Sequence, residues 1–514
     1  MGRRKLRSAK NFPPETTELL KVLDELYDLT LRDVSELPRD LLDNFGRVRT
    51  LVEQARALEK PFDEVPHRSE EAMRELVDWG IRRGCFVHGI QIRHLGDEAK
   101  GDDYGVFCTD ALRDSDIFLS VPLDLMLTSD YALEKCKPLS NALRDDPICS
   151  RMSNICLSLL LLNEVALGEE SFWHKYVCCL PGRYTTILYF TEDEMRLLNG
   201  SATLEEACNI YRSIARQYAH FKKKFLIDPT WRQLPAAKLF TYEAYRWACS
   251  SVMTRQNQVP SLSPGRMQAA LIPLWDMCNH DMLRSGTDYD VGSHQLVSFA
   301  TRSYAKDEQV CIFYGNRANG QFFVHNGFVP QMPNPWDSLP LRLSLSRSDQ
   351  LFETKRRLCE HMKIPTSSVF DLKKNPEGNG VLVPKLLLHL VHVLQWKPDT
   401  KVSDEVKADD TESQTADAAK KDEEKNDVAC NDGGDDSVDR DASSEAEGVR
   451  TKRAISYLQT RCQILLRTMP KSDEEIAGLL DDPNVSDETK LALRYRLSEK
   501  RMLELACKKL IFTM

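Results

Sequence analysis

The 514-residue sequence predicts an α+β protein in which a β-rich domain, split by a long helical insertion, precedes an all-helical C-terminal domain. Short runs with the composition of β-strands, each bounded by Gly, Asp or Pro, gather at residues 84–122 and again at 295–315. Between them, the apolar residues of 126–255 recur at helical spacing. Helical spacing resumes near Leu343. Two strand clusters that flank a helical segment indicate one β-rich domain with an insertion.

Three consecutive regions are expected along the chain. Residues 1–83 form an N-terminal helical region, since Leu19, Leu23 and Leu26 repeat with helical period. The split β-rich domain occupies 84–330 and contains the helical insert, at about 126–255. Residues 331–514 form the C-terminal domain. The expected strands lie at 84–92, 104–109, 116–122, 295–302 and 309–315.

The C-terminal domain contains two helix starts and one acidic interruption. Ser472 with Glu475 fits a capping box, and Ser486 precedes an acidic first turn. Residues 398–450 carry no aromatic residue and almost no large aliphatic one, so they cannot bury enough apolar surface to offset the entropy of ordering. We expect a disordered acidic loop there. An acidic tail that binds a partner is the alternative.

The net charge of −9 arises in that loop. Residues 401–450 hold 17 acidic and 7 basic side chains, a balance of −10, which leaves +1 for the rest of the chain. A near-neutral body beside an acidic loop disfavours nonspecific binding to nucleic acid.

Cysteine usage and hydropathy exclude several classes of protein. The 15 cysteines include no CxxC pair, which argues against a zinc ribbon and against a secreted disulfide framework. The basic start lacks the apolar region of a signal peptide, and no apolar run reaches membrane-spanning length. We expect a cytoplasmic monomer with no metal and with neither a membrane nor a nucleic-acid partner. Entry into the nucleus is left open.

Three segments hold the residues best suited to chemistry. Residues 251–260 offer Arg255 and Asn257, and 270–280 ends in Asp276-Met-Cys-Asn-His. Residues 309–319 end a strand at Tyr314-Gly315 and continue to Arg317. Taken alone, each segment is also typical of a turn or of the hydrophobic core. No Walker A loop, GxGxxG, GxSxG or HExxH is present.

The order of three signals resembles a SET-domain methyltransferase. These signals are Tyr104-Gly105-Val106, Asn279-His280 and Tyr314. The helical insert and the helical C-terminal region resemble the subgroup typified by the Rubisco lysine methyltransferase. Longer stretches are similar to the actin-histidine N-methyltransferases of that subgroup. They are RTLVE (49–53), SFWHKYVCCLPGRYTTILYF (171–190), RQYAHF (216–221), FTYEAYRWACSSVMTRQNQVP (240–260), ALIPLWDMCNH (270–280), IFYGNR (312–317) and IPTSSVFDL (364–372).

The resemblance implies S-adenosyl-L-methionine as cofactor. Arg255 is expected to meet the cofactor carboxylate, because a guanidinium fork suits a carboxylate. One glycine of the usual strand motif is replaced by Asp103, and His67 or Ser69 is an alternative to Arg68. The implied cofactor-binding residues are Arg68, Asp102, Tyr104, Arg255, Asp276, Met277, Cys278, Asn279, His280, Tyr314 and Asn326.

The resemblance also implies that the acceptor is a ring nitrogen of a histidine in actin. The implied catalytic residues are Asn257 and Tyr314. A side-chain amide that binds one ring nitrogen selects the tautomer and aims the other nitrogen, and Asn257 is the candidate for that role. The implied substrate-binding residues are Arg216, Asn257, Trp275, Ile312 and Arg317.

Two alternatives to this function stay open. One is a protein-lysine methyltransferase on the same fold, and the other is a non-catalytic SET scaffold that binds actin. The presence of Asn257, Asn279, His280 and Tyr314 argues against the scaffold.

Overall fold

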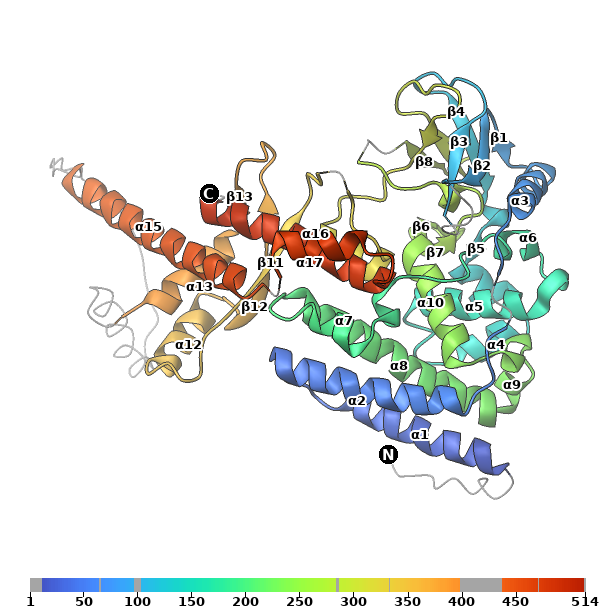
Figure 1. The fold of residues 1–514 in the computed structure, drawn as a ribbon, viewed down its shortest axis with the longest axis horizontal. Helices are drawn as coiled ribbons and strands as arrows, with labels where there is room; N and C mark the ends of the chain where they lie inside the picture. The colour runs from blue at the N-terminus through green and yellow to red at the C-terminus, as the bar shows by residue number, and fades with distance from the viewer. Residues whose placement is uncertain are drawn as a thin grey trace, which may run out of the picture. The chain divides into compact units, whose positions relative to one another are not determined.

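The computed structural model describes residues 12–63, 66–96, 103–282, 286–331, 333–397, 437–469 and 471–512. The chain divides into two compact units (Figure 1). The first contains residues 1–336 with 471–497, and the second contains 337–470 with 498–514. Helices and small sheets occur in both units, which confirms the α+β class.

Helices α1 (Pro14–Leu31) and α2 (Pro38–Ala57) pack against the long helix α8 (Thr203–Ile227), as Figure 1 shows. Each of the first two begins with proline, whose missing N–H costs no helical hydrogen bond in the first turn. Helix α3 (Glu70–Arg82) starts after Ser69, whose hydroxyl caps its first turn. These N-terminal helices belong to the same compact unit as the β-rich domain.

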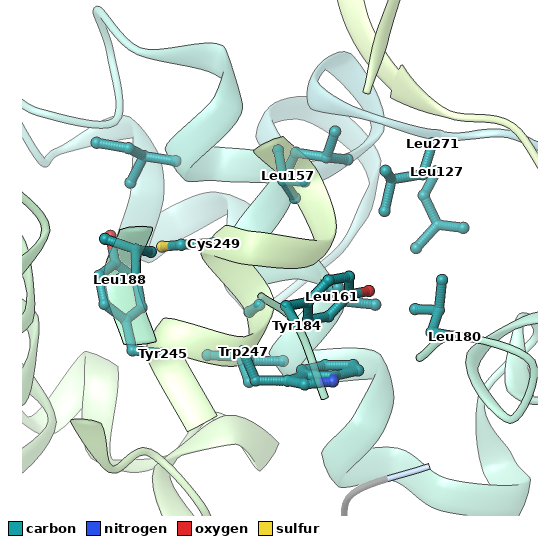
Figure 2. Close-up of a cluster of buried hydrophobic side chains, with 14 of the residues drawn as sticks. Leu127, Leu157, Leu161, Leu180, Tyr184, Leu188, Tyr245, Trp247, Cys249 and Leu271 are labelled. Carbon is teal, nitrogen blue, oxygen red and sulfur yellow. The ribbon is translucent and has the colours of Figure 1, made fainter. Parts of the chain in front are cut away.

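The helical insertion forms the apolar centre of the first unit. Helix α5 (Ser153–Leu167) is buried along nearly its whole length and packs against α10 (Tyr242–Arg255). Figure 2 shows Leu157 and Leu161 of α5 in a cluster that also contains Tyr245 and Trp247 of α10. A helix that is apolar on every side is stable only inside such a core. The other α-helices of the insertion are α4 (Leu139–Arg144), α6 (His174–Val177), α7 (Glu192–Arg196) and α9 (Pro229–Arg232).

The strands of the first unit form three small sheets, in the orders β1–β4–β9–β8, β10–β3–β2 and β5–β7–β6. Strand β4 pairs antiparallel with β9, β3 with β10 and β5 with β7. Strands β3 and β4 from before the insertion therefore pair with strands from after it, which confirms the split β-rich domain. The bounds are β1 Phe86–Val87, β2 Ile90–His94, β3 Tyr104–Cys108, β4 Ile117–Pro122, β5 Leu127–Thr128, β6 Asn257–Pro260, β7 Met267–Leu271, β8 Thr287–Asp290, β9 Gln295–Phe299 and β10 Gln309–Val310.

The second unit contains a four-stranded sheet, so the expectation of an all-helical C-terminal domain is wrong in that detail. The sheet has the order β11–β12–β13–β14. In β11, Leu339, Leu341 and Leu343 are buried at every second position, which is the period of a strand with one buried face. The elements are β11 (Ser338–Ser344), α12 (Phe352–His361), β12 (Ser367–Lys374), β13 (Val381–Val383), α13 (Lys385–Gln395), α15 (Ser437–Arg467) and β14 (Leu510–Phe512), together with the end of α17 (Asp487–Lys508).

The expectation of a disordered acidic loop over 398–450 is wrong for residues 437–450. Residues 398–436 lie outside the described part of the chain, but 437–450 form the start of α15 and are helical. A helix needs only local backbone hydrogen bonds, so the scarcity of apolar residues did not exclude one there. The two predicted helix starts are confirmed. Helix α16 (Asp473–Asp481) has the Ser472–Glu475 capping box, and Ser486 precedes α17.

Within the described ranges, none of the helices combines the length and the apolar character that crossing a bilayer requires.

Candidate functional site

A narrow pocket of about 60 Å³ forms where three distant segments of the first unit meet. Helix α10 ends at Arg255, and its C-cap Gln256 is extended, which turns the chain directly into β6. A short 3₁₀ helix, η8 (Trp275–Met277), supplies the second wall, and the segment after β10 supplies the third. Among the residues that line the pocket are these predicted site residues: Arg255, Asn257, Trp275, Asp276, Ile312, Tyr314, Arg317 and Asn326.

The segment that contains Asn279 holds both the backbone N–H and the side-chain hydroxyl of Tyr314. The N–H of Ile312 donates to the carbonyl of Asn279 at 2.8 Å. The N–H of Tyr314 donates to Nδ1 of His280 at 3.3 Å, and the Tyr314 hydroxyl donates to the carbonyl of Cys278 at 2.8 Å. Because the hydroxyl proton is used in this way, the oxygen keeps its lone pairs for another group. Burial raises the pKa of Tyr314, so the phenol stays neutral at physiological pH.

The His280 ring serves as part of the wall behind Tyr314. It lies 5.1 Å from the Tyr314 ring and 4.8 Å from the ring of Phe322, measured between centroids. Burial lowers the pKa of His280, so its imidazole is neutral and its Nδ1 can accept the hydrogen bond from Tyr314.

A buried ion pair lies beside the pocket. Arg255 Nη1 donates to the carbonyl of Asp276 at 2.6 Å and lies 3.5 Å from its Oδ1. The side chain of Asp276 is only 2% exposed. Burial raises the pKa of Asp276 to about 6, although the Arg255 charge favours the ionised carboxylate. Burial alone would lower the pKa of Arg255, but the charge of Asp276 and the nearby tyrosines together outweigh it and the pKa is raised.

Arg255 keeps one buried donor for a ligand. Its Nε is enclosed and has no hydrogen-bond partner within the described residues. A buried N–H without an acceptor is costly, so an anionic group bound here would restore the missing bond. Met277, the next residue after Asp276, places its sulfur 3.9 Å from Arg255 Nη1.

Tyr176 completes this cluster and was missed by sequence reasoning. It lies in α6, is fully buried, and its hydroxyl donates to Oδ2 of Asp276. It stands inside the 171–190 stretch that resembles the actin-histidine N-methyltransferases, but an aromatic residue among Trp173 and Tyr184 reads as core. No local pattern distinguished it.

The amide of Asn279 ties this segment to β3. Its Nδ2 donates to the carbonyl of Tyr104 at 3.1 Å. A Cβ atom on Gly105 would lie 2.9 Å from the same nitrogen and would overlap the amide of Gln309. Gly105 is therefore required by the close approach of two side-chain amides.

Arg68, with His67 and Ser69 as its predicted alternatives, lies against Tyr104. Its Nε donates to the carbonyl of Cys179 at 2.8 Å, and its guanidinium carbon stands 5.7 Å from the centre of the Tyr104 ring. Ser69 is used as the α3 cap and His67 is exposed. Asp102, also predicted to bind cofactor, lies outside the described residues.

The predicted substrate-side residues form the other wall of the pocket. Trp275 and Ile312 are buried, and the Trp275 ring is held by a 3.0 Å bond from its Nε1 to Thr287. Asn257 Oδ1 accepts the N–H of Gln258 at 2.8 Å and retains a second lone pair.

Arg317 is a partly buried cation in the same wall. Its Nη1 donates to Oδ1 of Asn326 at 2.8 Å, and burial lowers its pKa. It makes no ion pair with a carboxylate of the described chain. Asn326 is held in turn by its 3.3 Å bond to the carbonyl of Thr254.

Arg216 does not join the pocket. It lies on α8, and its Nη1 is 3.5 Å from the carbonyl of Thr30 in α1. The assignment of Arg216 to the substrate is therefore not supported by its position. The face of α8 that meets α1 could not be known from the spacing of α8 alone.

Comparison with known proteins identifies relatives of the whole chain. A family model described as Rubisco LSMT substrate-binding matches residues 346–503. The actin-histidine N-methyltransferases of Homo sapiens and Mus musculus are each 32% identical over 476 residues, covering 91% of this chain and 73% of theirs.

Solved structures agree with this chain in fold. The SET domain of LSMT bound to lysine and AdoHcy matches with a TM-score of 0.58 and 18% identity, and Rubisco LSMT bound to AdoMet with 0.55 and 19%. Each match covers 85% of this chain and 90% of the other. The chain therefore belongs to the actin-histidine N-methyltransferase family and is built on the SET-domain fold.

Proposed function

We propose that the protein transfers a methyl group from S-adenosyl-L-methionine to a ring nitrogen of a histidine in actin. The observation that carries the proposal is the meeting of Asn257 and Tyr314 in one pocket, beside the flat apolar surface of Trp275 and Ile312. The relatives described above carry the name of this activity.

The residues present fit this cofactor. When bound, it supplies a methyl group on a cationic sulfonium together with a carboxylate. The unpartnered Nε of Arg255 would bind the carboxylate, as a charge-assisted hydrogen bond. The Tyr314 hydroxyl presents lone pairs to the pocket, which favours a cationic neighbour. Asn279 and the backbone of Tyr104 would bind the rest of the cofactor.

Asn257 would orient the acceptor ring. A neutral imidazole has one protonated nitrogen and one free nitrogen, and only the free nitrogen can attack. The free lone pair of Asn257 Oδ1 can accept the N–H and thereby fix the reactive tautomer. Trp275 and Ile312 would support the ring and exclude water, so that the acceptor is held close to the reacting methyl group.

Arg317 would contact the substrate chain beside the acceptor. It is a partly desolvated guanidinium that has an amide oxygen but no carboxylate as partner among the described residues. A carboxylate or carbonyl of the substrate peptide would supply the missing acceptor.

The direct test is incubation with purified actin and methyl-labelled cofactor, followed by peptide mapping by mass spectrometry. We expect label on a histidine, and a loss of labelling of at least 100-fold in Asn257→Ala with cofactor affinity retained. Label on lysine would favour the lysine alternative. Failure of the purified protein to bind the cofactor in calorimetry would favour the non-catalytic scaffold.

We further propose that the protein works as a cytoplasmic monomer. All cysteines in the described part of the chain are free thiols, and most are buried, which suits a reducing compartment. Sedimentation of the purified protein and imaging of a tagged copy test the two statements separately.

A further inference from the structure

The ion pair beside the pocket depends on a third residue that contacts neither cofactor nor substrate in the proposed function. Asp276 places its carboxylate where solvent does not reach, and Arg255 meets only one of its two oxygens. The other oxygen, Oδ2, accepts the hydroxyl of Tyr176. Tyr176 is itself fully buried in α6, so no water competes for this bond.

We propose that Tyr176 is a positioning residue for the cofactor site: its hydroxyl fixes the Asp276 carboxylate, and that carboxylate holds the Arg255 guanidinium ready for the cofactor. This inference rests on the proposed use of S-adenosyl-L-methionine.

The contacts from Tyr176 to Asp276 to Arg255 explain which nitrogen of Arg255 is left to donate to the cofactor. Arg255 Nη1 donates to the backbone oxygen of Asp276 and lies 3.5 Å from its Oδ1, while Nε is left without a partner among the described residues. A carboxylate held on one side only could turn about its side-chain torsion and carry Arg255 with it. The Tyr176 hydroxyl prevents that rotation, and a bond to a charged group in a buried site is among the stronger hydrogen bonds.

The protonation of Asp276 gives this role a signature that packing alone would not produce. The cofactor has a net positive charge near neutral pH, so an ionised Asp276 favours its binding. Cofactor affinity is therefore expected to fall as the pH drops through about 6, where Asp276 takes up a proton. The Tyr176 hydroxyl stabilises the ionised form, so its removal moves this fall to higher pH. The titratable and charged groups around Asp276 are Tyr176, Arg255, Arg68, Tyr314, Cys179 and Cys278.

The test is calorimetric titration of the full-length protein with S-adenosyl-L-methionine between pH 5 and 8. We expect Tyr176→Phe to bind about 10-fold more weakly near pH 7 and to show the acid-side fall at higher pH than the unmodified protein. The matched control is Tyr245→Phe. Tyr245 is an equally buried tyrosine whose hydroxyl donates to Gln217 at 2.9 Å, so the control loses a comparable bond in the core.

Equal affinities and equal pH profiles for the two variants would overturn the inference. If Tyr176→Phe is too unstable to measure, Asp276→Asn serves in its place. It must weaken binding and abolish the acid-side fall, and a pH profile like that of the unmodified protein would refute the chain of contacts. Failure of the unmodified protein to bind the cofactor would instead refute the proposed function.

Discussion

Asp146 and Asp276 are both buried carboxylates of the first unit, but they are satisfied in different ways. Asp146 accepts hydrogen bonds from the backbone N–H groups of Ile148 at 2.9 Å and Cys149 at 3.3 Å, and from His220 at 2.7 Å. Lys224 adds a cation at 3.7 Å. Burial acts to raise the pKa of Asp146, but His220 and the backbone donors outweigh it and the pKa is lowered.

Asp276 has fewer partners and the opposite pKa shift. Its side chain has Tyr176 and Arg255, and its Oδ1 lacks a hydrogen bond within the described residues. Burial therefore prevails and raises its pKa to about 6. A fully bonded carboxylate stabilises the fold, whereas an incompletely bonded one beside a pocket indicates a ligand site. The opposite pKa shifts therefore distinguish Asp146, a carboxylate of the helical insertion, from Asp276, a carboxylate beside the pocket.

The largest effect is expected from Arg255→Leu. It leaves Asp276 buried without its cation and removes the donor for the cofactor carboxylate. Breaking a buried pair in this way costs about 3–5 kcal/mol of stability. Cofactor affinity should fall at least 100-fold, as measured by calorimetry on protein shown to be folded by circular dichroism. Retention of near-normal affinity would mean that the pocket does not use Arg255.

Asp146→Ala should lower stability without affecting the pocket. It removes the partner of His220 and two backbone N–H groups, and we expect a loss of about 3 kcal/mol in urea unfolding. The dissociation constant for the cofactor, measured on the folded variant, should stay within about 2-fold of its original value. A large change in this dissociation constant would indicate that Asp146 also contributes to the pocket.

The two carboxylates should give opposite slopes of stability against pH. Asp146 has a lowered pKa, so its contribution is present above its ordinary pKa of about 3.9 and is lost as the pH falls below it. Asp276 has a raised pKa, so its contribution is present below about 4 and is lost as the pH rises through about 6, by up to about 3 kcal/mol. Unfolding free energies at pH 4–6.5 should therefore decline less with pH in Asp276→Asn than in the unmodified protein.

Gly105→Ala should produce a smaller effect, confined to the pocket side. The added Cβ crowds the amides of Asn279 and Gln309 and displaces the bond from Asn279 to Tyr104. We expect a loss of about 1–3 kcal/mol of stability and weaker cofactor binding. Gly478→Ala is the matched control, because nothing lies within 4 Å of a Cβ placed there. Equal losses in both would argue against crowding at Gly105.

Parts of this picture could be predicted from the sequence, and the reason differs from residue to residue. Asn279, His280 and Tyr314 stand in short patterned segments, and the structure brings them together through backbone bonds of residues 279 and 281 with 312 and through the bonds of Tyr314. Tyr176 could not be found, because its role depends on a contact with Asp276, 100 residues away. Arg216 lies outside the pocket, and this could not be predicted because the partner of its helix face, α1, is also set by tertiary packing.

The same reasoning applies to the fold. The strand clusters on either side of the insertion predicted the split domain, because alternation and bounding residues are local signals. The sheet of the second unit was missed although Leu339, Leu341 and Leu343 alternate, since helical spacing was expected from near Leu343 and β11 is followed by helix α12. Alternation over so few residues does not exclude a helix.

The most direct test of the distinction between the two carboxylates is calorimetric titration of Asp276→Asn and Asp146→Asn with S-adenosyl-L-methionine, side by side at pH 7.5. We predict that Asp276→Asn lowers cofactor affinity about 10-fold or more while Asp146→Asn leaves it unchanged and loses stability instead. Equal effects of the two substitutions on cofactor affinity would contradict the assignment of Asp276 to the ligand site and of Asp146 to the fold.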